Sequence, residues 1–394
     1  MKKYTLLFLL LFFGRWLSAQ DTTDLWTKAR MNPNLGSHKY IELKLHGGTH
    51  LYASDELKNA LNDGYKSLEL RMGWQSTGEK AWQRVFNYPS YGIGFYTGDI
   101  GNPTILGNPS GIYSFFYAPF HRRKKNYFEA GLSLGITYDL NPYDSTTNPL
   151  NDAIGSKLDV YFNVGITGVL KVSDSFDFLY GADLTHFSNG RTHTPNLGLN
   201  MVGLNLGVRY HYNTIRTIVK KQIDPTYTAP RRPTFINAPI PEQLHYNEIS
   251  GYAAFGIVQA SSDEHLEAFY GTASLILEYN RRISHKSSFG GGLDGFYDGS
   301  LGWTYHQLYG QVRPSDKMLM GIHAGYVLHL RDFEVRAQIG TYTWKRDGEK
   351  GDYFMRLALR YNIGKYGFVQ LGLKTQDGVA SDWIEWGGGA KTRF

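Results

Sequence analysis

Residues 353–362 read YFMRLALRYN, a stretch whose alternate positions form two different sets of side chains. One face takes Tyr353, Met355, Leu357, Leu359 and Tyr361, and the other takes Phe354, Arg356, Ala358, Arg360 and Asn362. A two-residue period is that of a β-strand. Residues 333–340, FEVRAQIG, repeat the pattern, with both charges again on one face. These stretches predict strands with one apolar wall and one charged wall.

Runs of ten to fourteen residues with this alternation recur along the chain. They give about sixteen candidate strands, eight of them between 40 and 213 and up to eight between 245 and 394. Strands in soluble sandwiches are usually about five or six residues long, whereas a tilted membrane strand needs about nine to eleven. The sequence therefore predicts an all-β fold, a transmembrane antiparallel β-barrel with an apolar outer band and a polar lumen.

Export is indicated by the first residues. Residues 1–19 combine two lysines, a short apolar run and a small-residue end, which is the pattern of a cleavable signal peptide; an N-terminal segment, 20–39, follows. The final stretch, WIEWGGGAKTRF, ends on Phe394 and resembles the closing-strand signal of bacterial outer-membrane proteins. We expect a protein of the Gram-negative outer membrane, inserted by the outer-membrane assembly machinery. The chain has no cysteine. Its net charge of +6 suits anionic lipid headgroups, and a basic surface of a soluble protein explains that charge equally well.

Residues 214–244 form a basic linker with five prolines, which cannot supply the hydrogen bonds of a sheet. Counting strands from a periplasmic N-terminus places this linker in the periplasm. We expect residues 40–213 and 245–394 to close together as one barrel of about fourteen to sixteen strands, because the terminal signal occurs once and one closed sheet leaves no edge. The strands of Tyr40 and Phe394 would then be neighbours, and loops or the linker would plug part of a wide lumen. The alternative is an eight-stranded barrel plus a second β unit.

A histidine and a serine interrupt this pattern in DLTHFSNGRTHTPNLGLN, residues 183–200. His186 and Ser188 share the apolar face of their strand with Tyr180 and Leu184. Asn200 opens the apolar face of the next strand. The intervening loop brings the two strand ends together, so the three polar residues are predicted to cluster on the lipid-facing wall near the extracellular rim.

Unpaired polar groups on such a wall cost roughly 1 to 3 kcal/mol each, so the three side chains are expected to bond one another. A hydroxyl, an imidazole and an amide are the nucleophile, base and orienting group of acyl transfer. The neighbouring Asn189 and Gly190 would supply oxyanion donors. The alternative is that all of these are interfacial polar residues without a catalytic role.

At these residues the chain resembles the PagL-type lipid A 3-O-deacylases, the acyloxyacyl hydrolase family. The resemblance rests on H-F-S-N and on the downstream P-N-x-G of Pro195, Asn196 and Gly198, and it extends over about 40–213. It implies an eight-stranded outer-membrane hydrolase that acts on lipopolysaccharide, with His186 and Ser188 catalytic. The family usually has a glutamate fourteen positions after the histidine, where this chain has Asn200.

A second resemblance shares the motif. H-x-S-N-G-R, completed by Arg191, with an asparagine fourteen positions after the histidine, is similar to outer-membrane phospholipase A. That family implies a phospholipid substrate and calcium; otherwise no cofactor is expected. P-N-x-G favours the deacylase. A channel or structural barrel without activity is the alternative from another class.

Other motifs are weaker. His46 and His50 lie four apart, but their parity favours the lumen over a metal site, which needs a third ligand. His193 is expected to be a solvated loop residue. The stretch GGLDGFYDG faintly echoes GADLTHFSNG, with Asp294 and Asp298 on one face, and is interpreted as a strand without a site. No phosphate loop or nucleic-acid patch appears.

Overall fold

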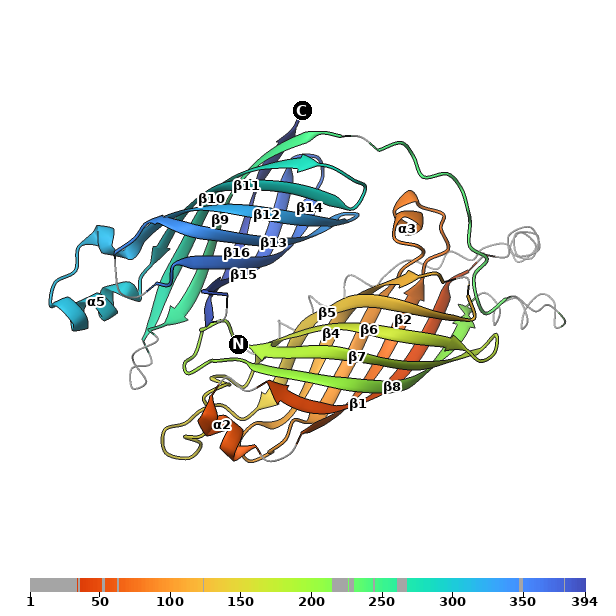
Figure 1. Cartoon of the computed structure of the whole chain (residues 1–394), viewed down its shortest axis with the longest axis horizontal. Helices are drawn as coiled ribbons and strands as arrows, with labels where there is room; N and C mark the ends of the chain where they lie inside the picture. The colour runs from red at the N-terminus through yellow and green to blue at the C-terminus, as the bar shows by residue number, and fades with distance from the viewer. Residues whose placement is uncertain are drawn as a thin grey trace, which may run out of the picture.

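The computed structural model describes residues 34, 36–51, 54–61, 64–122, 124–214, 226, 230–243, 245–260, 268–346, 350–378 and 380–394. Within them, sixteen strands form two closed antiparallel barrels of eight strands each (Figure 1). The predicted signal peptide lies outside the described residues. No helix in the described part of the chain is long and apolar enough to cross a membrane.

The first barrel contains β1 (His38–Leu51), β2 (Tyr65–Gln75), β3 (Ser90–Asp99), β4 (Gly107–Phe120), β5 (Asn126–Leu140), β6 (Asp159–Lys171), β7 (Phe176–Ser188) and β8 (Leu199–Asn213). The second contains β9 (Asn247–Gln259), β10 (Phe269–Arg282), β11 (Ser287–Asp298), β12 (Met318–Leu330), β13 (Phe333–Trp344), β14 (Tyr353–Ile363), β15 (Gly367–Gln376) and β16 (Ala380–Arg393). Short helices lie in the connections: α2 (Asp55–Ala60), α3 (Ala81–Val85), α5 (Leu301–Tyr309) and η1 (Pro314–Lys317).

The barrel class predicted from the alternation is confirmed, but closure into one large barrel is wrong. Tyr40 of β1 pairs with His211 of β8, while β16 pairs with β9 through Arg393 and Glu248. The strands of Tyr40 and Phe394 are therefore not neighbours. Two closed sheets leave no edge, just as one would, so the edge argument did not distinguish the two architectures.

The seam of the first barrel shows why β8 returns to β1. Arg209 of β8 donates from Nε to Oε2 of Glu42 on β1 at 2.7 Å, and both side chains are buried in the lumen. Arg209 also binds Glu129 of β5 across the barrel. Charges buried in this way need partners, and closure after eight strands supplies them.

Alternation separates wall from lumen in both barrels. In β14 the arginines Arg356 and Arg360 are buried, while Met355, Leu357 and Tyr361 are exposed. The outer walls carry exposed apolar side chains such as Leu204 on β8 and Leu275 on β10. Such a wall is what a lipid environment accommodates.

The expectation of a wide, partly plugged lumen is also wrong. An eight-stranded barrel is just wide enough for its own side chains to fill. In the second barrel, Arg356 binds Glu385 at 2.6 Å and Asp294 at 3.0 Å, and all three are buried. The first lumen holds Arg71 between Glu69, at 2.7 Å, and aromatic rings. Both lumens are therefore filled by paired charges and aromatic side chains.

The described linker residues pack on one end of the first barrel. Arg232 donates from Nη2 to Oδ1 of Asp177 in β7 at 2.7 Å, and Tyr88 donates to the carbonyl of Ile236 at 3.1 Å. Asp177 begins β7 and Ser188 ends it. The linker thus covers the rim opposite the loop that follows Ser188. Its location in the periplasm stays a prediction.

Candidate active site

His186 and Asn200 stand directly opposite each other in the register of β7 and β8. Both are half-buried, on the wall that also exposes Val202 and Leu204. Nδ1 of His186 lies 2.8 Å from Oδ1 of Asn200. Because Oδ1 only accepts, the imidazole donates from Nδ1, which leaves Nε2 free to accept a proton.

Ser188 ends β7 on the same face as His186, but its side chain is covered. Ser188 is 2% exposed. Its Oγ accepts from Nδ2 of Asn196 at 2.9 Å and from the backbone N–H of Gly190 at 3.2 Å, and it lies 3.3 Å from Oγ of Ser381. Of the three residues predicted to cluster, the structure pairs His186 with Asn200, and among the recorded hydrogen bonds of the described residues none joins Ser188 to His186.

One donor points at Ser188, and the next residue in the chain, Asn189, carries an unpaired one. The backbone N–H of Gly190 points at the Ser188 hydroxyl. Nδ2 of Asn189 is buried and has no hydrogen-bond partner in the described residues, while the Oδ1 of that side chain lies 3.4 Å from the N–H of His193. An unpaired buried donor of this kind is available to an additional acceptor.

Two glycines permit the tight loop between β7 and β8. Gly190 and Gly198 have φ angles of +65° and +77°, which favour glycine. A Cβ on Gly198 would lie 2.8 Å from Cε1 of His186, and one on Gly190 would lie 2.3 Å from Cγ1 of Ile384. Gly198 therefore makes room for the imidazole, and Gly190 for a side chain of the second barrel.

The second barrel reaches this loop, which the sequence did not predict. Gln259 at the end of β9 donates its backbone N–H to the carbonyl of Arg191 at 3.1 Å, and its Oε1 accepts from the N–H of Thr194 at 2.8 Å. Nη2 of Arg191 lies 3.0 Å from Oδ2 of Asp298. Figure 1 shows the chain between β7 and β8 beside the second barrel. The stretch GGLDGFYDG belongs to β11, as predicted, and its Asp298 makes a contact with Arg191 that the sequence did not indicate.

Asn196 is the other residue whose contact was missed. It was noted only as part of P-N-x-G, yet its Nδ2 donates to Ser188 and its Oδ1 accepts from the backbone N–H of Asn189 at 3.2 Å. The motif was the available clue. His193 is exposed, as expected, and its ring packs edge-on against Phe269 of β10 at 5.4 Å.

No group of three or more histidine, cysteine, aspartate or glutamate side chains in the described residues could hold a metal ion. His46 binds Asp183 in the lumen at 2.9 Å, and His50 binds the carbonyl of Ile100 at 2.9 Å. Both therefore lie on the lumenal side, as their parity predicted. Asp298 and Asp382, which lie beside Arg191 of the loop after β7, are paired with cations.

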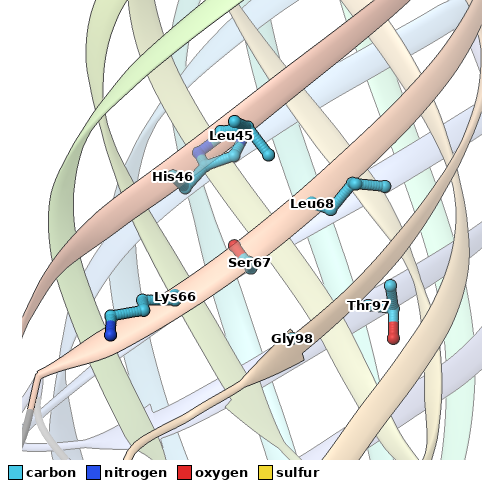
Figure 2. A pocket seen from close by; sticks show the side chains of 7 residues that line it. All are labelled: Leu45, His46, Lys66, Ser67, Leu68, Thr97 and Gly98. Atoms are coloured by element: carbon cyan, nitrogen blue, oxygen red, sulfur yellow. The ribbon is translucent and has the colours of Figure 1, made fainter.

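A separate hollow of about 430 Å³ lies on the wall formed by β1, β2 and β3 (Figure 2). Neither Ser188, His186 nor Asn200 lines it. Its lining residues are Leu45, His46, Lys66, Ser67, Leu68, Thr97 and Gly98. The hydrogen bonds around Ser188 locate the candidate site better than this hollow does.

Comparison with protein families defines the class. Residues 67–209 match the model of the lipid A 3-O-deacylase family, PagL, and residues 247–393 match that of the acyloxyacyl hydrolase C-terminal domain. The chain belongs to the PagL family, with one match in each barrel. Family membership and the barrel fold point to an outer-membrane protein and support a hydrolase acting on lipid A.

Comparison of the sequence with curated proteins finds no match. Among solved structures, a mutant of Rh. blastica porin is 10% identical, covering 91% of this chain and 99% of the porin, with a TM-score of 0.17. OccK5 (OpdH) from Pseudomonas aeruginosa is 8% identical, and the match covers 91% of this chain and 97% of the OccK5 chain, with a TM-score of 0.21. CdiB from Acinetobacter baumannii is 10% identical, and the match covers 91% of this chain and 60% of the CdiB chain, with a TM-score of 0.18. TM-scores this low support no conclusion about function.

Proposed function

We propose that the chain hydrolyses an ester-linked acyl chain of lipid A, with Ser188 as nucleophile, His186 as base and Asn200 as the orienting group. The hydrogen bond between His186 and Asn200 carries this proposal. It fixes the imidazole tautomer in which Nε2 is the acceptor, on a lipid-facing wall and two residues from a serine.

In the proposed reaction, the Ser188 hydroxyl turns from its present partners toward Nε2 of His186. Hydrogen bonds of this kind are often long in enzymes without substrate and tighten when substrate binds. Oγ attacks the ester carbonyl carbon as Nε2 takes its proton. The bond between the acyl carbon and the sugar oxygen then breaks, and Nε2 gives its proton to that leaving oxygen. Water attacks the acyl-serine in the same way and releases the fatty acid.

The carbonyl oxygen becomes negative in this step and needs donors. We assign this role to the unpaired Nδ2 of Asn189 and to the backbone N–H of Gly190. Donors that are already oriented stabilise the transition state without reorganisation. Asn200 orients His186 but brings no charge to balance the imidazolium.

The surroundings of the site suit a lipid that approaches within the membrane. Leu204 and Leu206 of β8, on the same wall as Asn200, are 71% and 57% exposed. An acyl chain would lie along this wall with its ester at the rim. The filled lumens of both barrels argue against the channel alternative.

The test is release of fatty acid from purified lipid A in detergent micelles, followed by mass spectrometry. Ser188→Ala and His186→Ala should each abolish release while the protein keeps the heat-dependent electrophoretic shift of a folded barrel. Ser110→Ala is the matched control, because it removes another rim serine hydroxyl, one that bonds Thr97 at 3.0 Å. Undiminished release by Ser188→Ala would refute the proposal, and release from diacylphospholipid only, dependent on calcium, would favour a phospholipase.

A further inference from the structure

The loop between β7 and β8 is held from both barrels. On the side of the first barrel, the N–H groups of Leu197 and Gly198 donate to the carbonyls of Asp152 and Ala153, each at 3.1 Å. On the side of the second barrel, Gln259 forms hydrogen bonds with the backbone carbonyl of Arg191 and the backbone N–H of Thr194. The first half of the loop, which adjoins Ser188, is thus held by the second barrel as well as by hydrogen bonds within the loop.

Arg191 makes the charged part of this contact. Its Nη2 lies 3.0 Å from Asp298 and 3.7 Å from Asp382, and both carboxylates are buried. Burial lowers the pKa of Arg191, but the two carboxylates raise it above its ordinary value, so the guanidinium is charged. A buried cation that has its partners in place is costly to move.

The second barrel does not need Arg191 to neutralise these carboxylates. Lys350 binds Asp298 at 2.7 Å and also contacts Asp382, and Lys374 binds Asp382 at 2.5 Å. Two lysines already balance two aspartates. The arginine is therefore an addition from the first barrel, and removing its charge leaves a balanced cluster behind.

The same arginine sits in a backbone conformation that has to be held. Gly190 and Arg191 both have φ angles of +65°. A left-handed conformation is unfavourable for a residue with a Cβ. The contacts of Arg191 with Asp298 and Gln259 offset that cost. The turn they maintain carries the N–H of Gly190, 3.2 Å from the Ser188 hydroxyl, and the unpaired amide of Asn189.

We propose that Arg191, clamped by Asp298 and Asp382 of the second barrel, is a positioning residue for acyl transfer. It holds the turn that presents Asn189 and Gly190 to the reacting oxygen, which makes the second barrel part of the active site. This inference rests on the proposed function. A clamp that only held the two barrels together would not act selectively on the chemical step.

The experiment compares the full-length protein with Arg191→Gln and Arg191→Lys in the lipid A assay. Misplaced oxyanion donors weaken transition-state binding, so Arg191→Gln should lower kcat by about 10- to 100-fold and change KM by less than about threefold. Arg191→Lys keeps the charge and should recover about tenfold of that loss. Asp298→Asn should lower kcat at least as much as Arg191→Gln, because it removes the partner of Lys350 together with that of Arg191.

The matched control is Arg346→Gln. Arg346 forms an ion pair with Asp316 in the connections at the same end of the second barrel, and its other contacts among the described residues are with Tyr305 and Tyr309. It should keep wild-type kcat. If Arg191→Gln kept kcat within about threefold, or if Arg346→Gln lowered it equally, the positioning role would be refuted.

Amide hydrogen exchange of the peptide 187–198 tests the clamp without any activity. Arg191→Gln should accelerate exchange there relative to wild type and to Arg346→Gln, because the turn loses its anchor. Unchanged exchange would refute the clamp even if kcat fell. An inactive wild-type protein whose exchange still responds to Arg191→Gln would instead refute the proposed function and leave the clamp standing.

Discussion

Asn200→Ala is the change whose effect follows most directly from the geometry. It removes the side chain whose Oδ1 lies 2.8 Å from Nδ1 of His186. A neutral hydrogen bond contributes about 0.5 to 1.5 kcal/mol, and an unpaired buried donor costs about 1 to 3 kcal/mol. His186 is half-buried, so water reaches its ring in part and the lower half of that range applies.

A loss of about 1 to 2 kcal/mol corresponds to roughly 5- to 30-fold in kcat. Loss of the nucleophile should cost far more, about 10⁴-fold or greater. Initial rates of fatty acid release from lipid A measure both. Val202→Ala is the control, because it truncates the next outward-facing residue of β8, which stands opposite Leu184 rather than His186. Wild-type kcat in Asn200→Ala would show that another group orients the imidazole.

Four further predictions concern the candidate site and the lumen of the second barrel. Asn200→Glu should retain activity, since a carboxylate at this position also accepts from Nδ1; a loss as large as that of Ser188→Ala in the same release assay would contradict the assigned role. Asn189→Ala should lower kcat by about 10²- to 10³-fold with little change in KM, and a changed KM alone would mean substrate binding instead. Chelation of calcium should leave the rate of lipid A hydrolysis unchanged, because the proposed steps use protein groups only; loss of rate with recovery on added calcium would favour the phospholipase alternative. Arg356→Met leaves Asp294 and Glu385 without a shared cation in the second lumen, so it should destabilise that barrel by roughly 3 to 5 kcal/mol, seen as a lower temperature of the electrophoretic shift; an unchanged temperature would contradict the pairing.

The walls of both barrels could be predicted because the period of a strand decides which side chains share a face. Arg336 and Arg356 were placed on the polar side, and both are buried in the lumen. Closure could not be predicted in this way. Every strand offers the same hydrogen bonds to any neighbour, and the contact that closes the first barrel, Arg209 with Glu42, joins residues 167 positions apart.

The candidate site was also predictable only in part. Parity and the loop between the two strands were enough to predict that His186 and Asn200 lie close together, and the register places them directly opposite each other. The cover over Ser188 was not accessible to such reasoning, because Ser381 and Ile384 reach it from another barrel. The way in which the two closed barrels pack decides which part of each outer wall faces the other barrel. Strand alternation does not indicate this packing.

The central claim is that Ser188 cleaves an acyl ester of lipid A, and the composition of lipid A in living membranes tests it most directly. Mass spectra of lipid A would be compared between Gram-negative cells that express the wild-type chain and cells that express equal amounts of folded Ser188→Ala. The account predicts a species lighter by one acyl chain in the wild-type cells and its absence in the variant. The same shortened species in Ser188→Ala cells, or none in either, would contradict it.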